Sequence, residues 1–183
     1  MTRLLSFFRC YRLNFRLKEL VIAMGLVLAL IVILLQIFAT FPTMAGYGMN
    51  PTLYHKERVV VLRYAELRHF RLIAFRDERT DQVEILRLIG LPGETVTYRA
   101  DQLMINGQNK TERFLALSRQ SYSESGLTYT EDMAVVVPAH HYLLLGDNRP
   151  YAVDSRSVGM IREDQIIGVA YFRFPTLTAL IGQ

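Results

Sequence analysis

The chain has 183 residues, which is enough for one domain with its own core plus an anchor, and too few for two large domains. Lys and Arg number 21 against 17 Asp and Glu, a formal net charge of +4, but five of the basic residues fall among the first 18 positions. The rest of the chain therefore carries 16 basic and 17 acidic side chains, and this balance argues against a nucleic-acid-binding function.

The N-terminal part of the sequence has the pattern of a membrane anchor. Residues 1–19 form a basic arm with Arg3, Arg9, Arg12, Arg16 and Lys18. Residues 20–41 are apolar apart from Gln36 and a few small residues. At about 1.5 Å per residue, a helix of this length spans the hydrocarbon core of a bilayer, which is about 30 Å thick. We predict a transmembrane helix at 20–41, and the positive-inside rule predicts a cytoplasmic arm at 1–19 and an extracellular domain at 42–183.

A cleaved signal peptide is the competing interpretation of these residues. The apolar region of a signal peptide spans about 7–15 residues and ends at a small-residue cleavage site. The run at 20–41 is longer, which favours a stable single-pass anchor in the plasma membrane. Cys10, the only cysteine, then lies on the cytoplasmic side, where thiols stay reduced, so the outer domain has no disulfide.

Beyond residue 41, short β-branched or aromatic runs alternate with turn-rich segments. We predict strands at 59–62, 72–75, 83–89, 96–98, 103–105, 134–137, 142–145 and 166–174. The predicted fold class is therefore mainly β, an antiparallel β-sheet domain that follows one N-terminal transmembrane helix.

Polar segments indicate how these strands are connected. Residues 77–80 read as the tip of a hairpin, and Asn106-Gly107 is a turn dipeptide whose residues tolerate positive φ. Pro138 lacks the N–H that a ladder needs, so we expect it to end the strand before it. Residues 108–130 are polar with few apolar side chains, and we expect a mobile excursion or a cap.

The sequence offers no Cys/His cluster with metal-ligand spacing. His140 and His141 are adjacent, and in a strand they would point to opposite faces. We therefore expect neither a metal ion nor another cofactor.

Three segments carry the most specific motifs of the chain. They are GYGMNPTL at 46–53, LRLIGLPGE at 86–94 and GDNRPYAVDSRSVGM at 146–160. In this order they resemble the nucleophile segment G-x-S-M-x-P-T-L, the general-base segment K-R-V-I-G-L-P-G-D and the C-terminal signature of the type I signal peptidases. Members of that family are membrane-anchored serine endopeptidases that cleave secretory leader peptides. The resemblance covers most of the chain and implies the antiparallel β-sheet fold of the family.

The chain departs from this family at the residues that carry the chemistry. In the family, a serine hydroxyl attacks the scissile carbonyl, and an unprotonated lysine, whose pKa is lowered by burial, accepts the proton. Here Gly48 stands at the serine position and Leu86 at the lysine position. The family also has a serine whose hydroxyl orients the lysine, and here that position is Ala152. The resemblance therefore implies a pseudoenzyme, a degenerate serine endopeptidase that lacks the Ser/Lys dyad.

Other motif residues match the structural and binding parts of the family pattern. Asp154 and Arg156 match a structural ion pair beside the family's site. The family's substrate lies as an extended strand against two segments and forms main-chain hydrogen bonds with them. The matching positions, which we expect to bind a substrate or partner, are Tyr47, Gly48, Met49, Asn50, Pro51, Gln82, Glu84 and Leu86. This mode of binding needs backbone edges and small pockets, so it can persist after catalysis is lost.

The resemblance implies a non-catalytic accessory or chaperone role at the cell surface. Degenerate members of the family are known among Gram-positive bacteria as accessory proteins of sortase-dependent pilus assembly. By analogy, the expected partners are the cytoplasmic membrane, an extended segment of a secreted or surface protein such as pilin, and sortase.

Two alternatives remain open: an active type I signal peptidase with displaced catalytic residues, and a surface binding domain unrelated to pili. A displaced pair would combine one of Ser118, Ser121, Ser123, Ser125, Ser155 and Ser157 with a base such as His55, Lys56 or His141.

Overall fold

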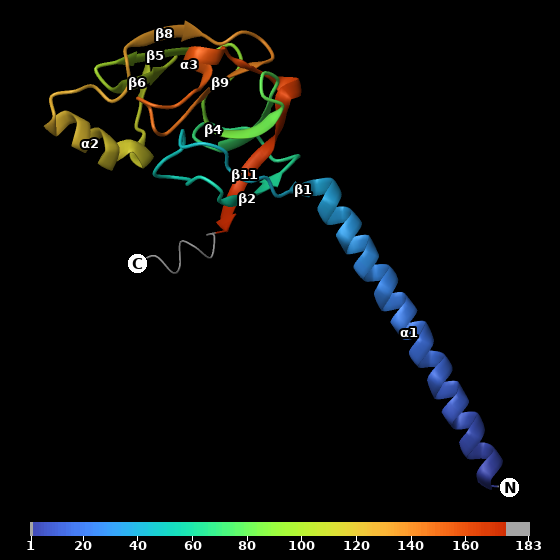
Figure 1. Cartoon of the computed structure of the whole chain (residues 1–183). Helices are drawn as coiled ribbons and strands as arrows, with labels where there is room; N and C mark the ends of the chain where they lie inside the picture. The colour runs from blue at the N-terminus through green and yellow to red at the C-terminus, as the bar shows by residue number, and fades with distance from the viewer. Residues whose placement is uncertain (1, 175–183) are drawn as a thin grey trace. The chain divides into compact units, whose positions relative to one another are not determined.

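The computed structural model describes residues 2–174, and it describes the surroundings of side chains from Leu17 to Tyr171. The chain divides into two compact units, one up to residue 39 and one from residue 40 onward (Figure 1). Each unit is described by itself below.

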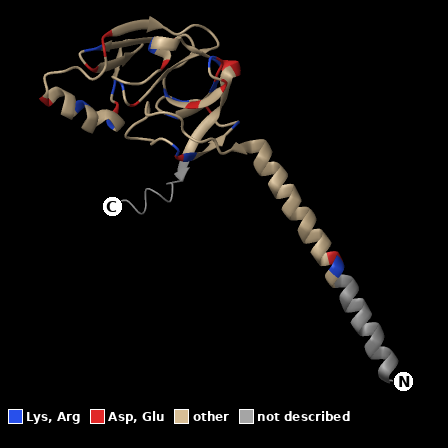
Figure 2. Cartoon of the chain, viewed as in Figure 1, with Lys and Arg blue, Asp and Glu red and all other residues tan. Residues whose placement is uncertain are grey.

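The first unit is one continuous helix, α1 (Thr2–Phe38). Its sequence contains no proline, so nothing in the basic arm breaks the helix, which begins well before the predicted residue 20. It ends at Phe38 rather than at the predicted residue 41, because the short strand β1 (Ala39–Thr40) follows directly. Residues Leu17–Phe38 are long and apolar enough to cross a membrane, and Figure 2 shows charged residues at only one end of this stretch.

The second unit is built from two antiparallel sheets. The larger sheet has the strand order β1-β2-β11-β3-β4-β9-β10. Its remaining strands are β2 (Arg58–Leu62), β3 (Leu72–Asp77), β4 (Gln82–Gly90), β9 (His141–Leu145), β10 (Ile161–Arg162) and β11 (Ile166–Phe174). The smaller sheet has the order β7-β6-β5-β8. Its strands are β5 (Thr95–Arg99), β6 (Gln102–Ile105), β7 (Gln108–Lys110) and β8 (Met133–Val136). The mainly β, antiparallel fold is thus confirmed.

The predicted strand regions and turns agree with the observed elements. Each predicted region lies within or overlaps a strand, and β8 ends at Val136, shortly before Pro138. Asn106 and Gly107 have φ of 51° and 75°, as expected for the turn between β6 and β7. In the hairpin between β3 and β4, the carboxylate of Asp77 accepts a hydrogen bond from the N–H of Arg79 over 2.9 Å.

The segment 108–130, which was expected to be a mobile excursion or a cap, contains regular elements. It contains β7, the 3-10 helix η1 (Arg113–Leu115) and the helix α2 (Ala116–Glu124). Leu115 is fully buried and fixes η1 to the domain, whereas α2 has no buried residue. A helix with no buried face lacks the apolar periodicity from which helices are predicted, which explains why the sequence did not indicate it. The short elements α3 (Ser155–Val158) and η2 (Glu163–Gln165) were also not predicted.

Two apolar clusters hold the second unit together. One joins the two sheets, with Ile89 and Leu143 of the larger sheet and Val96 and Leu103 of the smaller sheet among its members. The other lies on the larger sheet and contains strand residues such as Ile73, Ile85 and Leu86 together with Met49 and Leu53. Because Met49 and Leu53 belong to the motif at 46–53, their burial positions this motif against the larger sheet.

Candidate functional site

The three motif segments meet around one buried carboxylate. Asp147, which has no exposed surface, accepts a hydrogen bond from Nε of Arg87 over 2.7 Å and also pairs with Nη2 of the same guanidinium. The hydroxyl of Thr52 donates to Oδ2 of Asp147, the oxygen that also pairs with Nη2 of Arg87. Arg87 lies on β4, Thr52 in the first motif and Asp147 in the third, so Asp147 connects segments that are far apart in the sequence.

Gly48 and Ala152 lie beside each other in this site. The backbone N–H of Asn148 donates to the carbonyl of Gly48 over 2.9 Å, and the amide group of its side chain donates to the carbonyl of Tyr47 over 3.2 Å. A Cβ atom added to Gly48 would lie 3.6 Å from Cβ of Ala152, an ordinary van der Waals contact. The backbone at Gly48 therefore has room for a Cβ atom.

Leu86 is part of the apolar core. It pairs across the sheet with Ile73 and is 4% exposed. It belongs to the same apolar cluster as Met49, the residue after Gly48. Met49 was predicted to contact a partner, but it has no exposed surface, because its apolar side chain anchors the first motif in the core.

Strand β4 has an unpaired edge next to these residues. β3 pairs with β4 from Gln82 to Arg87, whereas β9 pairs with β4 only from Arg87 onward. Leu88 exchanges backbone hydrogen bonds with Phe70 and Arg71 on the β3 side. Since backbone groups alternate between the two sides of an antiparallel strand, Val83 and Ile85 direct their N–H and C=O groups away from β3.

In the described part of the chain, no strand or loop forms backbone hydrogen bonds with Val83 or Ile85 on that side. Ile85 has no exposed surface, and buried backbone polar groups without a partner destabilise a fold. Another buried group is also unsatisfied, since the side-chain oxygen Oδ1 of Asn50, in the first motif, has no hydrogen-bond partner among the described residues. Such groups call for a physical explanation.

The other predicted binding residues lie closer to the surface. Tyr47 is 65% exposed, with its ring 5.5 Å from the ring of His55, and Pro51 and Gln82 are exposed. Glu84 is half-buried. Burial raises the pKa of Glu84, the nearby Asp77 carboxylate raises it further, and the Arg79 guanidinium partly opposes both effects.

Asp154 holds the loop that contains Ala152. Its carboxylate pairs with Arg156, with Nη2 at 2.7 Å and Nε at 2.9 Å, and accepts the backbone N–H of Gly146 over 3.0 Å. Arg156 also donates to the carbonyl of Arg149 over 2.6 Å. The two ends of the loop are therefore fixed to one carboxylate.

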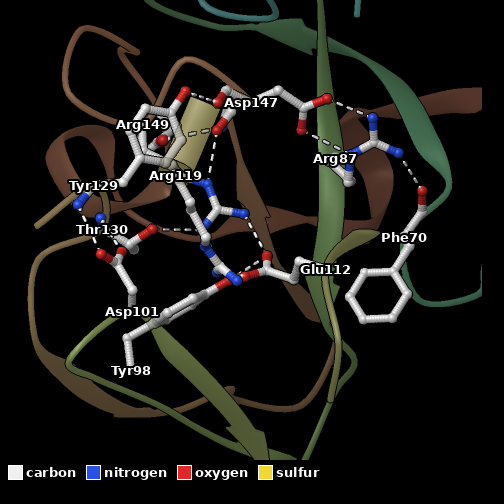
Figure 3. Close-up of polar contacts among 12 residues, drawn as sticks. Phe70, Arg87, Tyr98, Asp101, Glu112, Arg119, Tyr129, Thr130, Asp147 and Arg149 are labelled. Atoms are coloured by element: carbon white, nitrogen blue, oxygen red, sulfur yellow. Dashed lines mark hydrogen bonds and ion pairs between the residues drawn. The ribbon is translucent and has the colours of Figure 1, made fainter. Parts of the chain in front are cut away.

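A second set of buried charges was not predicted from the sequence (Figure 3). Arg149 and Glu112, both with fully buried side chains, form an ion pair at 2.6 Å. The hydroxyl of Tyr98 donates to Glu112 over 2.7 Å, and Arg119 of α2 pairs with the other oxygen of Glu112. Burial alone would lower the pKa of Arg149, but the neighbouring Tyr98 and Glu112 raise it above its usual value. The guanidinium therefore stays charged. Arg149 lies in a recognised motif, whereas nothing in the sequence marked Glu112 as its partner.

Two serine hydroxyls of the third motif have structural hydrogen bonds. Ser155 accepts the backbone N–H of Leu144 over 3.0 Å, and Ser157 donates to the carbonyl of Asp154 over 3.1 Å. Within the residues that the structure describes, no serine hydroxyl bonds to a lysine or histidine side chain. The same residues contain no group of His, Cys, Asp and Glu that could hold a metal ion.

Comparisons with known proteins agree on one family. Residues 17–175 match the family described as "Signal peptidase, peptidase S26". Signal peptidase I U of Bacillus subtilis (strain 168) is 33% identical over 159 residues, which covers 84% of this chain and 85% of that protein. Signal peptidase IB of Staphylococcus aureus is 33% identical over 171 residues, which covers 86% of this chain and 89% of that protein. The crystal structure of a signal peptidase I from Enterococcus faecalis V583 aligns with a TM-score of 0.55 and 39% identity, covering 57% of this chain and 97% of that one.

Proposed function

Because this chain belongs to the signal peptidase family, peptidase S26, we propose that it is a membrane protein that binds an extended peptide at the family's site without cleaving it. The single observation that carries this proposal is the unpaired edge of β4 at Val83 and Ile85, beside positions 48 and 86, where the residues lack the chemistry of a peptidase.

The residues at the two dyad positions support the absence of catalysis. Gly48 has no side chain that could attack a carbonyl, and Leu86 has no nitrogen that could accept a proton. Losing either member of such a pair lowers turnover by on the order of 10⁶-fold, and losing both costs little more, because they act as one unit. The expected residual activity is therefore negligible.

The hydrogen bonds of two candidate serines support the absence of a replacement pair. Ser155 and Ser157 are engaged in structural hydrogen bonds beside Asp154, and neither reaches a basic side chain in the described residues. Ala152 agrees with this interpretation, since a hydroxyl that orients a lysine has no function once the lysine is absent. An active peptidase remains the competing function, because the relatives are named signal peptidases.

The backbone around the site is suited to β-strand addition. A peptide that pairs with Val83 and Ile85 would satisfy their free N–H and C=O groups, as in other complexes formed by adding a strand to a sheet edge. The exposed Tyr47 and the unsatisfied carbonyl oxygen of Asn50 lie on the segment that would flank such a peptide. Binding at this place depends on main-chain groups, so it does not require a nucleophile.

The more specific role is assistance to pilus assembly at the surface of a Gram-positive cell. A non-catalytic relative that holds a secreted segment would act as an accessory factor or chaperone for pilin, beside sortase. We assign this role by analogy with degenerate family members, and fold alone does not determine it. A surface binding function unrelated to pili would keep the same peptide site and differ only in the partner.

The proposed topology is a single pass through the plasma membrane, with the basic arm in the cytoplasm, the apolar part of α1 up to Phe38 in the membrane and the β-sheet domain outside. The basic arm supports this orientation through the positive-inside rule. Cys10 provides a direct measurement, because it is the only cysteine. A membrane-impermeant maleimide should label it only after the cells are permeabilised, and labelling of intact cells would reverse the orientation.

The absence of catalysis is tested by incubating the full-length chain in detergent with a preprotein that carries a signal peptide. We expect no cleavage above background. The double variant Gly48→Ser, Leu86→Lys should gain little cleavage activity. Adding Ala152→Ser should give measurable cleavage, because the added hydroxyl orients the lysine. Steady cleavage by the unaltered chain that is lost on mutating one of its serines would establish an active peptidase, and equal activity of the double and triple variants would refute the role of the hydroxyl.

Peptide binding is tested separately by photo-crosslinking in living cells. A photoreactive phenylalanine at Tyr47, which is 65% exposed, should capture a secreted or surface protein. The same substitution at Tyr64, which is 75% exposed and outside the motifs, provides the matched control. Crosslinking that is equal at the two positions would contradict a binding site at the β4 edge. Capture of pilin, and loss of pilus polymers on deletion of the gene, would support the pilus role.

A further inference from the structure

Glu84 occupies a defined position on the unpaired part of β4. Side chains alternate between the faces of a strand, so Glu84 shares one face with Gln82 and Leu86. Its cross-strand partner on β3 is Phe75, which is 3% exposed and offers no hydrogen-bonding group. In the described residues, the Glu84 carboxylate has neither a hydrogen bond nor an ion pair.

The charges around Glu84 do not neutralise it. Burial and the Asp77 carboxylate raise the pKa of Glu84, so its ionised form is disfavoured by its surroundings. Arg79 is the nearby cation, but its guanidinium is already bound to Asp77, with Nη2 at 2.6 Å and Nε at 3.0 Å. The ionised carboxylate therefore lacks a counterion within its own fold.

A strand that pairs with Val83 and Ile85 would place one of its side chains directly beside Glu84 on the same face. We propose that the bound peptide carries a lysine or arginine at this position, so that Glu84 selects its partner by charge. This inference rests on the proposed peptide-binding function and adds the chemical class of the peptide.

The register of β4 extends this requirement to the flanking positions. Peptide residues two positions to either side of the basic residue would lie beside Leu86 and Gln82 on the same face. Leu86 is buried and apolar, and Gln82 is exposed and polar. Read from its N-terminus, an antiparallel peptide should have the pattern apolar-x-basic-x-polar. A parallel peptide should have the reverse pattern, polar-x-basic-x-apolar.

The test measures binding of fluorescein-labelled peptides of this pattern to the full-length chain in nanodiscs of zwitterionic lipid, by fluorescence anisotropy. Three peptides differ only at the central position, which is Lys, its uncharged analogue norleucine, or Glu, and each is made in both directions. The Lys peptide should bind about five-fold more tightly than the norleucine peptide, in the range of a partly exposed ion pair. Glu84→Gln should abolish this preference, and Glu84→Lys should shift it to the Glu peptide.

Glu78→Gln is the matched control, because it removes an acid from the adjacent hairpin tip whose carboxylate is already paired with Arg162. It should leave the preference for Lys unchanged. Equal affinity of the Lys and norleucine peptides, or a preference that survives Glu84→Gln, would overturn the role of Glu84 and leave peptide binding intact. Failure of all the peptides to bind the unaltered chain would instead contradict the proposed function.

Discussion

Leu86 and Arg87 are neighbours on β4 with opposite surroundings. Leu86 packs in the apolar cluster of the larger sheet, whereas Arg87 pairs with Asp147, donates to the carbonyl of Phe70 over 2.7 Å and lies 3.8 Å from the ring centre of Phe114. The first position is where the family's lysine would stand, and the second connects the motif segments. Position 86 therefore lacks a polar side chain that could transfer a proton, whereas position 87 has a polar side chain that stabilises the fold.

The same contrast separates two larger regions. Gly48 has no side chain, Leu86 and Ala152 present only apolar side-chain atoms, and Leu86 is packed in the apolar cluster of the larger sheet. The adjacent region, with Arg149 and Glu112, contains charges that are fully buried and mutually bonded. Because a buried polar group without a partner costs about 1–3 kcal/mol, a site without the lysine is more stable with a hydrocarbon there. The comparison indicates that the residues at these three positions favour packing, whereas the buried charges are each compensated by a partner.

The largest effect is expected from breaking the ion pair of the charged region. Arg149→Met leaves the Glu112 carboxylate buried beside Tyr98 with only Arg119 as a counterion. Removing one partner of a buried pair typically costs about 3–5 kcal/mol. We expect a loss of this size in the free energy of unfolding, measured by denaturant titration of the full chain. Arg149→Met with Glu112→Gln should recover part of it, and a double variant no more stable than the single one would show that the two residues do not act as a pair.

A smaller effect should distinguish two glycines that lie next to each other in space. A Cβ on Gly146 would come within 2.3 Å of Cβ of Ala152 and 2.5 Å of the carbonyl oxygen of Gly48, whereas a Cβ on Gly48 meets its neighbours at 3.6 Å or more. Gly146→Ala should therefore lower stability by about 1–3 kcal/mol through overpacking, and Gly48→Ala should change it by less than about 0.5 kcal/mol. Melting temperatures of the two variants test this difference.

Ala152→Gly in the Gly146→Ala background should restore part of the stability, because it removes one of the two close contacts. Equal melting temperatures for the two single alanine variants would mean that the loop at 146–152 moves freely enough to accept either side chain. In that case the apolar region would not be rigidly packed, and its contrast with the charged region would be weaker.

The strands could be predicted from the sequence, but the buried charge pairs could not. Runs such as 59–62 and 142–145 are dense in β-branched or large apolar residues, so their strands could be predicted from local pattern alone. The charged network could not be predicted in this way, because Arg87 and Asp147 are separated by 60 positions and Arg149 and Glu112 by 37. Pairing over such distances depends on how the strands are ordered in the sheet, which the local pattern does not reveal. The helix α2 was missed because it buries none of its residues.

The smallest expected effect concerns Glu84, which belongs to neither region. Its pKa is raised in the folded protein, mainly by burial, so the folded state binds the proton more tightly than the unfolded state. The resulting penalty is absent below the unfolded pKa of about 4.3 and is complete once the pH has risen through the folded pKa. Glu84→Gln should therefore stabilise the chain at pH 7, by less than about 1 kcal/mol because the group is partly exposed to solvent, and should give no gain at pH 3.

Melting temperatures at the two pH values test this sign, with Glu78→Gln as the control, for which we expect no gain at pH 7. Equal destabilisation by Glu84→Gln at both pH values would show that the carboxylate is stabilised within the fold by contacts that do not depend on its charge. If Glu84→Gln both stabilises the domain at pH 7 and loses the preference for basic peptides, Glu84 contributes to binding and not to stability. Glu84 would then destabilise its own domain and stabilise the complex with a basic peptide. The peptide would supply the counterion for Glu84, as Glu112 supplies it for Arg149 within the fold.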